Sequence, residues 1–145
     1  MVITNSTLTS FAGAHEWTGD NDDFGTFVIG RRRNAILEVQ AGALVSNVLC
    51  VGVMPVSSNT DRWFTGLLRQ TGGEVRPASG RPTCGIGGRY GNATYLMEGG
   101  LLQPVGEFNI GNYSEGTLDL RAGTAIYPAG IALGGCNGAY GLLRA

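Results

Sequence analysis

Glycine is spread so evenly through this chain that long helices are excluded. The sequence holds 25 glycines and 5 prolines, and the longest stretch free of both is residues 1–12. A globular helix averages about 11–12 residues, and each interior glycine costs about 1 kcal/mol relative to alanine. Nearly every internal window is therefore too short or too costly for a helix, and short strands joined by glycine turns remain.

The hydrophobic pattern predicts nine strands, at residues 24–29, 35–39, 44–54, 62–68, 93–97, 107–110, 117–121, 124–127 and 139–143. Apolar and charged residues alternate from Leu118 to Arg121, which is typical of a strand with one buried and one wet face. Residues 44–54 are apolar on both faces over most of their length, which predicts one central strand. Residues 80–91 are expected to form a long loop.

Many short strands with turn signals between them indicate an all-β fold. We expect residues 1–145 to form a single β domain, a jelly-roll-like sandwich or barrel. Residues 1–10 favour strand and are a candidate N-terminal arm, able to pair with a neighbour's free sheet edge or with their own sheet. The segment 37–44 is echoed by 118–125, either by coincidence or because the two are related sheet corners.

The surface of this protein is expected to be largely covered by other protein. Charged residues make up 14% of the chain and hydrophobic residues 43%, whereas a soluble domain carries about 25% charge. All 10 cationic residues are arginine, the cation enriched at interfaces, although a GC-rich genome would also favour arginine. The net charge of -1 argues against nucleic acid or an anionic membrane as the main partner.

The sequence has few residues suited to metal binding, cofactor binding or acid-base catalysis, so we expect that the protein is not an enzyme and has no cofactor. His15 is the one histidine, and the three cysteines, Cys50, Cys84 and Cys136, lie far apart without metal-ligand spacing. Residues 85–91 are glycine-rich but lack the Lys-Ser/Thr pair of a phosphate-binding loop.

One acidic segment superficially matches a calcium loop. Residues 20–25 place acids at alternate positions and a glycine at the sixth. The twelfth position is Arg31, where an EF-hand needs a bidentate glutamate, so the EF-hand match fails. A looser surface calcium site remains an alternative.

The residues expected to contact a partner fall into three groups. The segment Asp61, Arg62, Trp63 and Phe64 combines an arginine with aromatics, the types that dominate binding hot spots, and is the first choice for a contact loop. The other two groups are the cationic run Arg31, Arg32 and Arg33 and the arm residues Val2, Ile3 and Leu8.

A chain of this length, with low charge, glycine-punctuated strands and strand-turn passages such as residues 116–135, resembles the small decoration, or cement, proteins of tailed bacteriophages. The resemblance implies a virion structural protein, made in the host cytoplasm, that binds the capsid exterior and stabilises contacts between major capsid subunits. Its expected partners are the major capsid protein and copies of itself. The alternative is a trimeric β receptor- or carbohydrate-binding head of a phage fibre. A cupin-like enzyme would need metal ligands that the sequence lacks.

Overall fold

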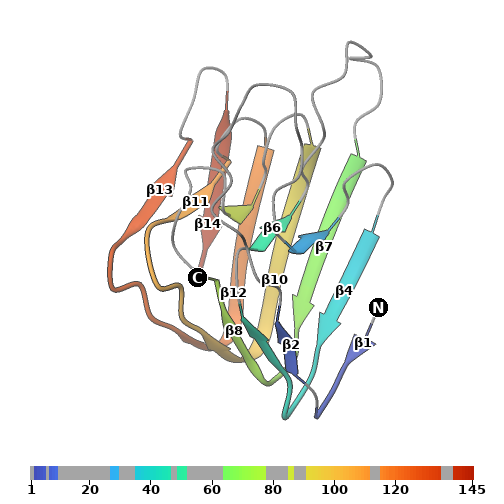
Figure 1. Cartoon of the computed structure of the whole chain (residues 1–145). Coiled ribbons are helices and arrows are strands. Elements are labelled where there is room, and N and C mark those ends of the chain that lie inside the picture. The colour runs from blue at the N-terminus through green and yellow to red at the C-terminus, as the bar shows by residue number, and fades with distance from the viewer. Residues whose placement is uncertain are drawn as a thin grey trace.

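The computed structural model of this protein describes residues 2–5, 7–9, 27–29, 35–46, 49–51, 64–77, 85–86, 91–111, 115–134 and 139–145. Within these ranges the regular elements are strands, labelled β1 to β14, and no helix is present. The expectation of an all-β protein without long helices is therefore confirmed for the described part of the chain (Figure 1).

The strands wind into a three-sided coil. The first side consists of β1 (Val2–Ile3), β4 (Ala35–Val39), β7 (Phe64–Gln70), β10 (Gly91–Leu102), β12 (Glu115–Ala125) and β14 (Tyr140–Arg144). The second side consists of β2 (Thr7–Thr9), β5 (Leu44–Ser46) and β8 (Glu74–Arg76), followed by the last residues of β10 and β12. The third side consists of β3 (Phe27–Ile29), β6 (Leu49–Val51), β9 (Gly85–Ile86), β11 (Phe108–Ile110) and β13 (Ile131–Leu133).

Every strand pair in the described residues is parallel and joins one turn of the coil to the next. The first side has the order β1, β4, β7, β10, β12 and β14, seen side by side in Figure 1. The third side has the order β3, β6, β9, β11 and β13. This arrangement is a parallel β-solenoid, in which each turn contacts only its neighbours.

A glycine with positive φ marks the corner between the first and second sides in four successive turns, at Gly42, Gly73, Gly100 and Gly123. At Gly100, where φ is 88°, a Cβ would lie 2.5 Å from the carbonyl oxygen of Gly73. The same carbonyl accepts a hydrogen bond from the Leu101 amide at 2.9 Å, so the corners stack backbone on backbone. Any side chain here would separate the turns.

The echo between residues 37–44 and 118–125 is this corner, seen in the second and fifth turns. Leu37 and Leu118 belong to one register row, with Leu68 and Tyr95 between them. Each of these four residues precedes a corner glycine by five positions. Of the two interpretations that the sequence left open, the related sheet corners are confirmed.

Inward-facing side chains stack into columns that form the core. On the first side one column contains Leu37, Leu68, Tyr95 and Leu118, all buried. The second side adds Val45, Val75 and Leu102, and the third adds Phe108 and Ile110. Apolar side chains from successive turns therefore bury one another, which is how a solenoid builds a continuous core.

The fully buried polar side chain of Gln70 lies inside this core and is satisfied there. Its Oε1 accepts a hydrogen bond from the Tyr95 hydroxyl at 2.5 Å. Its Nε2 donates to the carbonyl oxygens of Gly73 and Leu101, both at 3.1 Å. The Gln70 amide thereby ties the corner of one turn to the start of the second side in the next.

The expectation of a jelly-roll-like sandwich or barrel is not confirmed. A jelly roll is built from antiparallel Greek keys, whereas the described strands pair in parallel across successive turns. The single central strand expected at residues 44–54 is wrong, because β5 and β6 lie on different sides of the coil. Residues 117–121 and 124–127 were expected as two strands, but β12 runs unbroken from Glu115 to Ala125 around a corner.

Candidate functional site

Among the described residues, no turn follows β13 and β14 to cover the core columns. Leu143 on β14 lies in register with the fully buried Leu118, yet 36% of its surface is exposed. Leu133 on β13 lies in register with the fully buried Ile110, yet it is 51% exposed. These two leucines occupy core positions that no further turn covers among the described residues.

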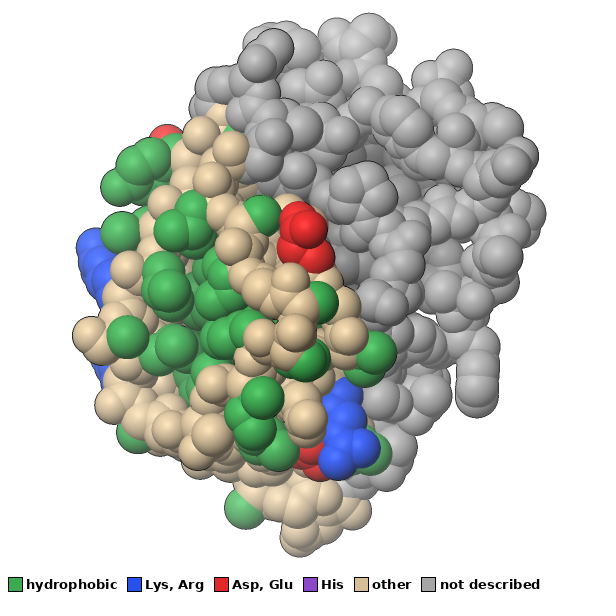
Figure 2. Space-filling model, turned by 90° about the vertical axis from the view of Figure 1, so that its left-hand side faces the viewer, with side chains coloured by type: hydrophobic (Ala, Val, Ile, Leu, Met, Phe, Trp, Pro, Cys, Tyr) green, Lys and Arg blue, Asp and Glu red, His purple; other side chains and the backbone are tan. Residues whose placement is uncertain are grey.

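Figure 2 looks onto this end of the molecule and shows hydrophobic side chains gathered over its described part, with few charged side chains in view. We call this surface the open end and define it by β13 and β14, with Leu133, Tyr140 and Leu143 exposed on it. Within the described part of the chain, no strand pairs with the outer edges of β13 and β14. The open end therefore combines exposed apolar core positions with unpaired backbone groups, which favours contact with protein.

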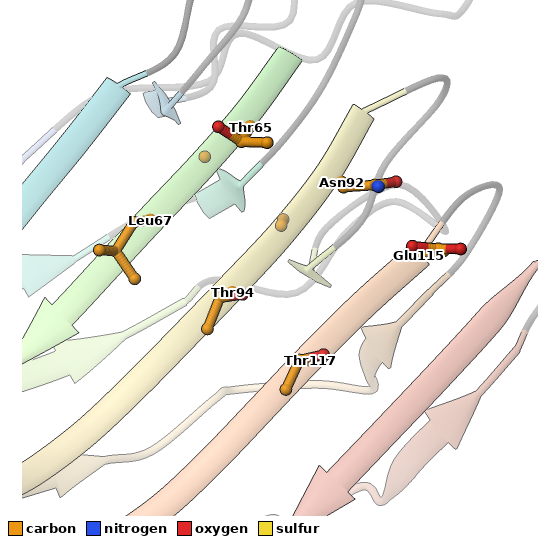
Figure 3. Close-up of a pocket in the computed structure, with 8 residues that line it drawn as sticks. Thr65, Leu67, Asn92, Thr94, Glu115 and Thr117 are labelled. Atoms are coloured by element: carbon orange, nitrogen blue, oxygen red, sulfur yellow. The ribbon is translucent and has the colours of Figure 1, made fainter. Parts of the chain in front are cut away.

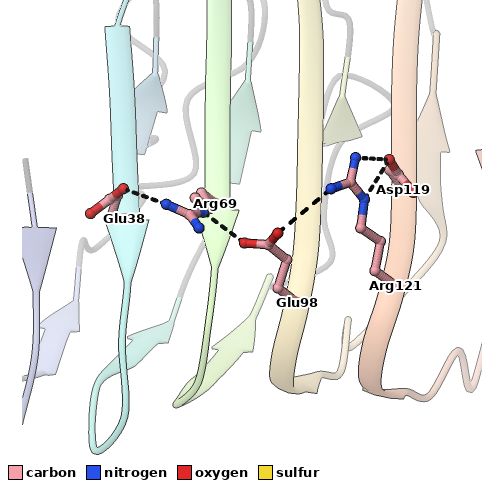
Figure 4. Close-up of polar contacts among 5 residues, drawn as sticks. All are labelled: Glu38, Arg69, Glu98, Asp119 and Arg121. Carbon is pink, nitrogen blue, oxygen red and sulfur yellow. Dashed lines mark hydrogen bonds and ion pairs between the residues drawn. The ribbon is translucent and has the colours of Figure 1, made fainter.

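An ion-pair ladder crosses the outer face of the first side (Figure 4). Arg69 lies between Glu38, at 3.4 Å, and Glu98, at 2.7 Å. Arg121 continues the ladder, since its guanidinium lies 3.6 Å from Glu98 and 3.0 Å from Asp119. The hydrogen bond and charge of Glu98 raise the pKa of Arg69. The members are solvent-accessible, so the ladder fixes the pairing of charges on this face more than it stabilises the fold.

A groove of about 310 Å³ lies beside the ladder, across the beginnings of β7, β10 and β12. Figure 3 shows the side chains that line it, and the residues that carry polar groups are Thr65, Asn92, Thr94, Glu115 and Thr117. The Oδ1 atom of Asn92 is buried and accepts no hydrogen bond from any residue the structure describes. Tyr140 on β14 is 59% exposed and lies in register with Glu115, one of the residues that line the groove.

The structure describes only some of the residues predicted to contact a partner. Val2 is exposed, and β1 pairs with β4, with Ile3 in register with Val39. Leu8 lies on β2, which pairs with β5. The described parts of the N-terminal arm therefore join their own sheet, while the other edge of β1 carries no strand among the described residues.

Phe64 begins β7, and its neighbours Asp61, Arg62 and Trp63 lie outside the described residues. The cationic run Arg31 to Arg33 also lies outside them, as do His15, Cys84, Cys136 and the candidate calcium segment 20–25. Cys50 lies on β6. The described residues contain no cluster of metal-ligating side chains and no helix long and apolar enough to span a membrane.

The open end and the groove were missed from sequence, although β14 was expected at almost its observed place, residues 139–143. The pattern of Tyr140 to Arg144 indicates a strand but does not say which strand it pairs with.

No protein-family model, curated protein or solved structure matches this chain.

Proposed function

We propose that this protein is a non-catalytic structural protein that works within a protein assembly, as a virion decoration protein on a capsid exterior. The observation that carries the proposal is the open end. A solenoid needs its terminal turn covered by a polar cap or by a partner. Here Leu133 and Leu143 lie exposed at core positions that no described strand covers, which supports a protein partner as their cover.

The low charge of the chain supports the same proposal. With 14% charged residues, an isolated molecule would have few charges to keep its surface hydrated and to prevent self-association. Five of the described charged side chains are already engaged with one another in the ion-pair ladder. In the proposed role, protein docks against this sparse surface, the partners are the major capsid protein and copies of this chain, and buried area does the work without catalysis.

The test compares two aspartate substitutions at exposed apolar residues. Leu143→Asp places a charge in the open end, whereas Val105→Asp places one at a 63% exposed site on a different turn. We expect Leu143→Asp to lower occupancy on capsids of the phage that encodes the chain and to lower the temperature at which they rupture. Equal occupancy of both variants and the unsubstituted protein, with intact circular dichroism spectra, would argue against the proposal.

A second candidate function, the receptor- or carbohydrate-binding head of a fibre, is favoured by the groove. Its amide, carboxylate and hydroxyl groups suit the hydroxyls of a sugar, and Tyr140 offers an exposed ring beside Glu115. Glu115→Gln and Tyr140→Ala are then expected to abolish binding on a glycan array. Glu107→Gln, at an exposed acid outside the groove, is the control. Absence of glycan binding by the unsubstituted protein would exclude this candidate.

A further inference from the structure

The first and last strands described on the first side offer unequal edges for pairing. At the N-terminal end, β1 provides a first-side edge of two residues, Val2 and Ile3. At the open end, β14 provides a first-side edge of five residues, from Tyr140 to Arg144. A head-to-tail contact between these edges would be heterologous and would grow into an open filament unless it closed into a ring. The longer edge pairing with itself closes after two copies.

The sequence of β14 is self-complementary when two copies run antiparallel about Leu142. Tyr140 and Arg144 then lie opposite each other, as do Gly141 and Leu143, while Leu142 faces its own counterpart. Directly opposed residues of an antiparallel pair lie on the same face of a sheet. Tyr140, Leu142 and Arg144 lie in register with Glu115, Thr117 and Asp119, which line the outer face.

Charge also favours this alignment. Arg144 lies in register with Asp119, and Tyr140 lies in register with Glu115. On the outer face, one row of side chains across the junction would consist of Glu115 and Tyr140 of one copy, followed by Arg144 and Asp119 of the second copy. The arginine meets an aromatic ring, a favourable cation–π partner, with a carboxylate on either side of this pair. No two like charges face each other across the junction.

The inner face fits in the same alignment. Leu143 occupies a core position and would lie opposite Gly141 of the second copy, which carries no side chain. A Cβ at Gly141 would lie 2.1 Å from the carbonyl oxygen of Ile110, so the backbone there is already in close contact with the third side of its own coil. The exposed Leu143 side chain would thereby lie against Gly141 of the second molecule instead of in water.

We propose that the open end is covered by a second copy of this chain, through antiparallel pairing of β14 with β14 about a two-fold axis at Leu142. The inference rests on the proposed function in taking the open end as a surface for protein contact, and it names the occupant. The product is a closed dimer with one continuous first-side sheet.

Charge-swapped variants at the two-fold axis test this proposal. The dissociation constant of the purified 145-residue chain is measured by sedimentation equilibrium. Leu142→Asp and Leu142→Lys each place like charges opposite each other, and we expect each to raise the dissociation constant at least about tenfold. An equimolar mixture of the two variants places Asp opposite Lys and is expected to restore the dimer.

The control pair is Thr94→Asp and Thr94→Lys, since Thr94 lies in the same row as Leu142 but two strands from the edge. Neither control is expected to change dimerisation. Restoration by mixing also shows that the Leu142 variants are folded. A monomeric unsubstituted protein, a dimer indifferent to both Leu142 changes, or failure of the mixture to restore it would each overturn the two-fold contact. Steadily growing oligomers would instead indicate head-to-tail stacking and would overturn it too.

Failure of this inference and failure of the proposed function are separable. A monomer that still binds capsids through the Leu143 site retains the proposed function and overturns the two-fold dimer. A dimer with the charge-swap behaviour that never associates with capsids retains the inference and overturns the decoration role.

Discussion

Two tyrosines packed in the same core differ in how their hydroxyls are satisfied. The Tyr95 hydroxyl donates to Gln70, which is fully buried and itself anchored to two carbonyls. The Tyr127 hydroxyl is buried and has no hydrogen-bond partner among the described residues. Because an unsatisfied buried polar group is costly and a satisfied one is not, the same substitution should destabilise the protein at Tyr95 and be neutral or stabilising at Tyr127.

We therefore expect Tyr95→Phe to lower the free energy of unfolding by about 1–3 kcal/mol, because it leaves the Gln70 oxygen without its donor. Tyr127→Phe removes a hydroxyl that has no partner among the described residues. It keeps the ring, whose centroid lies 6.4 Å from that of Phe108, so stability should stay within about 0.5 kcal/mol or rise. Urea unfolding of the two variants measures both values. Equal destabilisation of both would contradict this account.

The pH dependence of stability should also report on Tyr95. Burial, and secondarily the charge of Tyr127, raises the pKa of Tyr95 well above its usual value, and burial raises the pKa of Tyr127 to about 12. A tyrosine is neutral below its pKa, so the folded state holds a proton that the unfolded chain releases near pH 10. The contribution is present below pH 10 and is lost as pH rises above it.

For Tyr95 alone, stability should fall by about 1.4 kcal/mol per pH unit above pH 10. Urea unfolding of the unsubstituted protein and of Tyr95→Phe, from neutral pH upward, isolates this contribution. The difference between the two proteins should shrink above pH 10. A constant difference would mean that Tyr95 ionises in the folded state as readily as in the unfolded one.

At the level of the strands and corners, glycine sets how closely successive turns can stack. Gly123 repeats the situation of Gly100, with a φ of 99° and a Cβ position 2.7 Å from the carbonyl oxygen of Gly100. These corners combine a left-handed backbone with contact to the preceding turn. Gly130, with a φ of 107°, has the unusual backbone but nothing within 4 Å of its Cβ position.

The pair Gly100→Ala and Gly130→Ala separates these two effects. At Gly130 only backbone strain is added, about 1–3 kcal/mol. At Gly100 the new methyl group would also lie 2.5 Å from the Gly73 carbonyl oxygen and 2.6 Å from the side-chain Nε2 of Gln70. We therefore expect a clearly larger loss of stability or failure to fold. Denaturant unfolding measures the difference. Similar losses at both sites would mean that stacking at the corner tolerates a side chain.

For the whole molecule, the consequence of an open-ended coil is an apolar surface whose exposure depends on association. An environment-sensitive dye such as ANS binds exposed hydrophobic surface. If association covers the open end, ANS fluorescence per molecule should fall as the protein concentration rises through the dimerisation range. The dimer-defective Leu142→Asp should keep its fluorescence at all concentrations, and Thr94→Asp should behave like the unsubstituted protein. A fluorescence independent of concentration in all three would show that association covers another surface.

Several parts of this fold could be predicted because they depend on local chemistry. The strand at residues 35–39 matches β4, and residues 107–110 contain β11, since alternating or β-branched residues between glycines favour strand whatever the partner. The echo between residues 37–44 and 118–125 was visible because two corners share the residues that the corner requires. The two turns between them were missed for two reasons. Gln70, Thr71 and Glu98 differ from the residues at the matching positions of the other corners. The spacing of the repeat also falls, from 31 residues between Gly42 and Gly73 to 23 between Gly100 and Gly123.

Glycine spacing and hydrophobic alternation thus determine that this chain forms short strands, and they exclude long helices, since backbone propensity and side-chain period act within a few residues. They do not determine which strands pair. A glycine turn can fold a strand back as a hairpin or direct it around a coil. The pairing that decides between these outcomes joins strands such as β7 and β10, in which Leu68 and Tyr95 are register partners 27 positions apart. Exposure of Leu143 likewise depends on the absence of a following turn among the described residues, not on its neighbours in sequence. The parallel coil and its open end are therefore properties of long-range pairing, which only the tertiary structure decides.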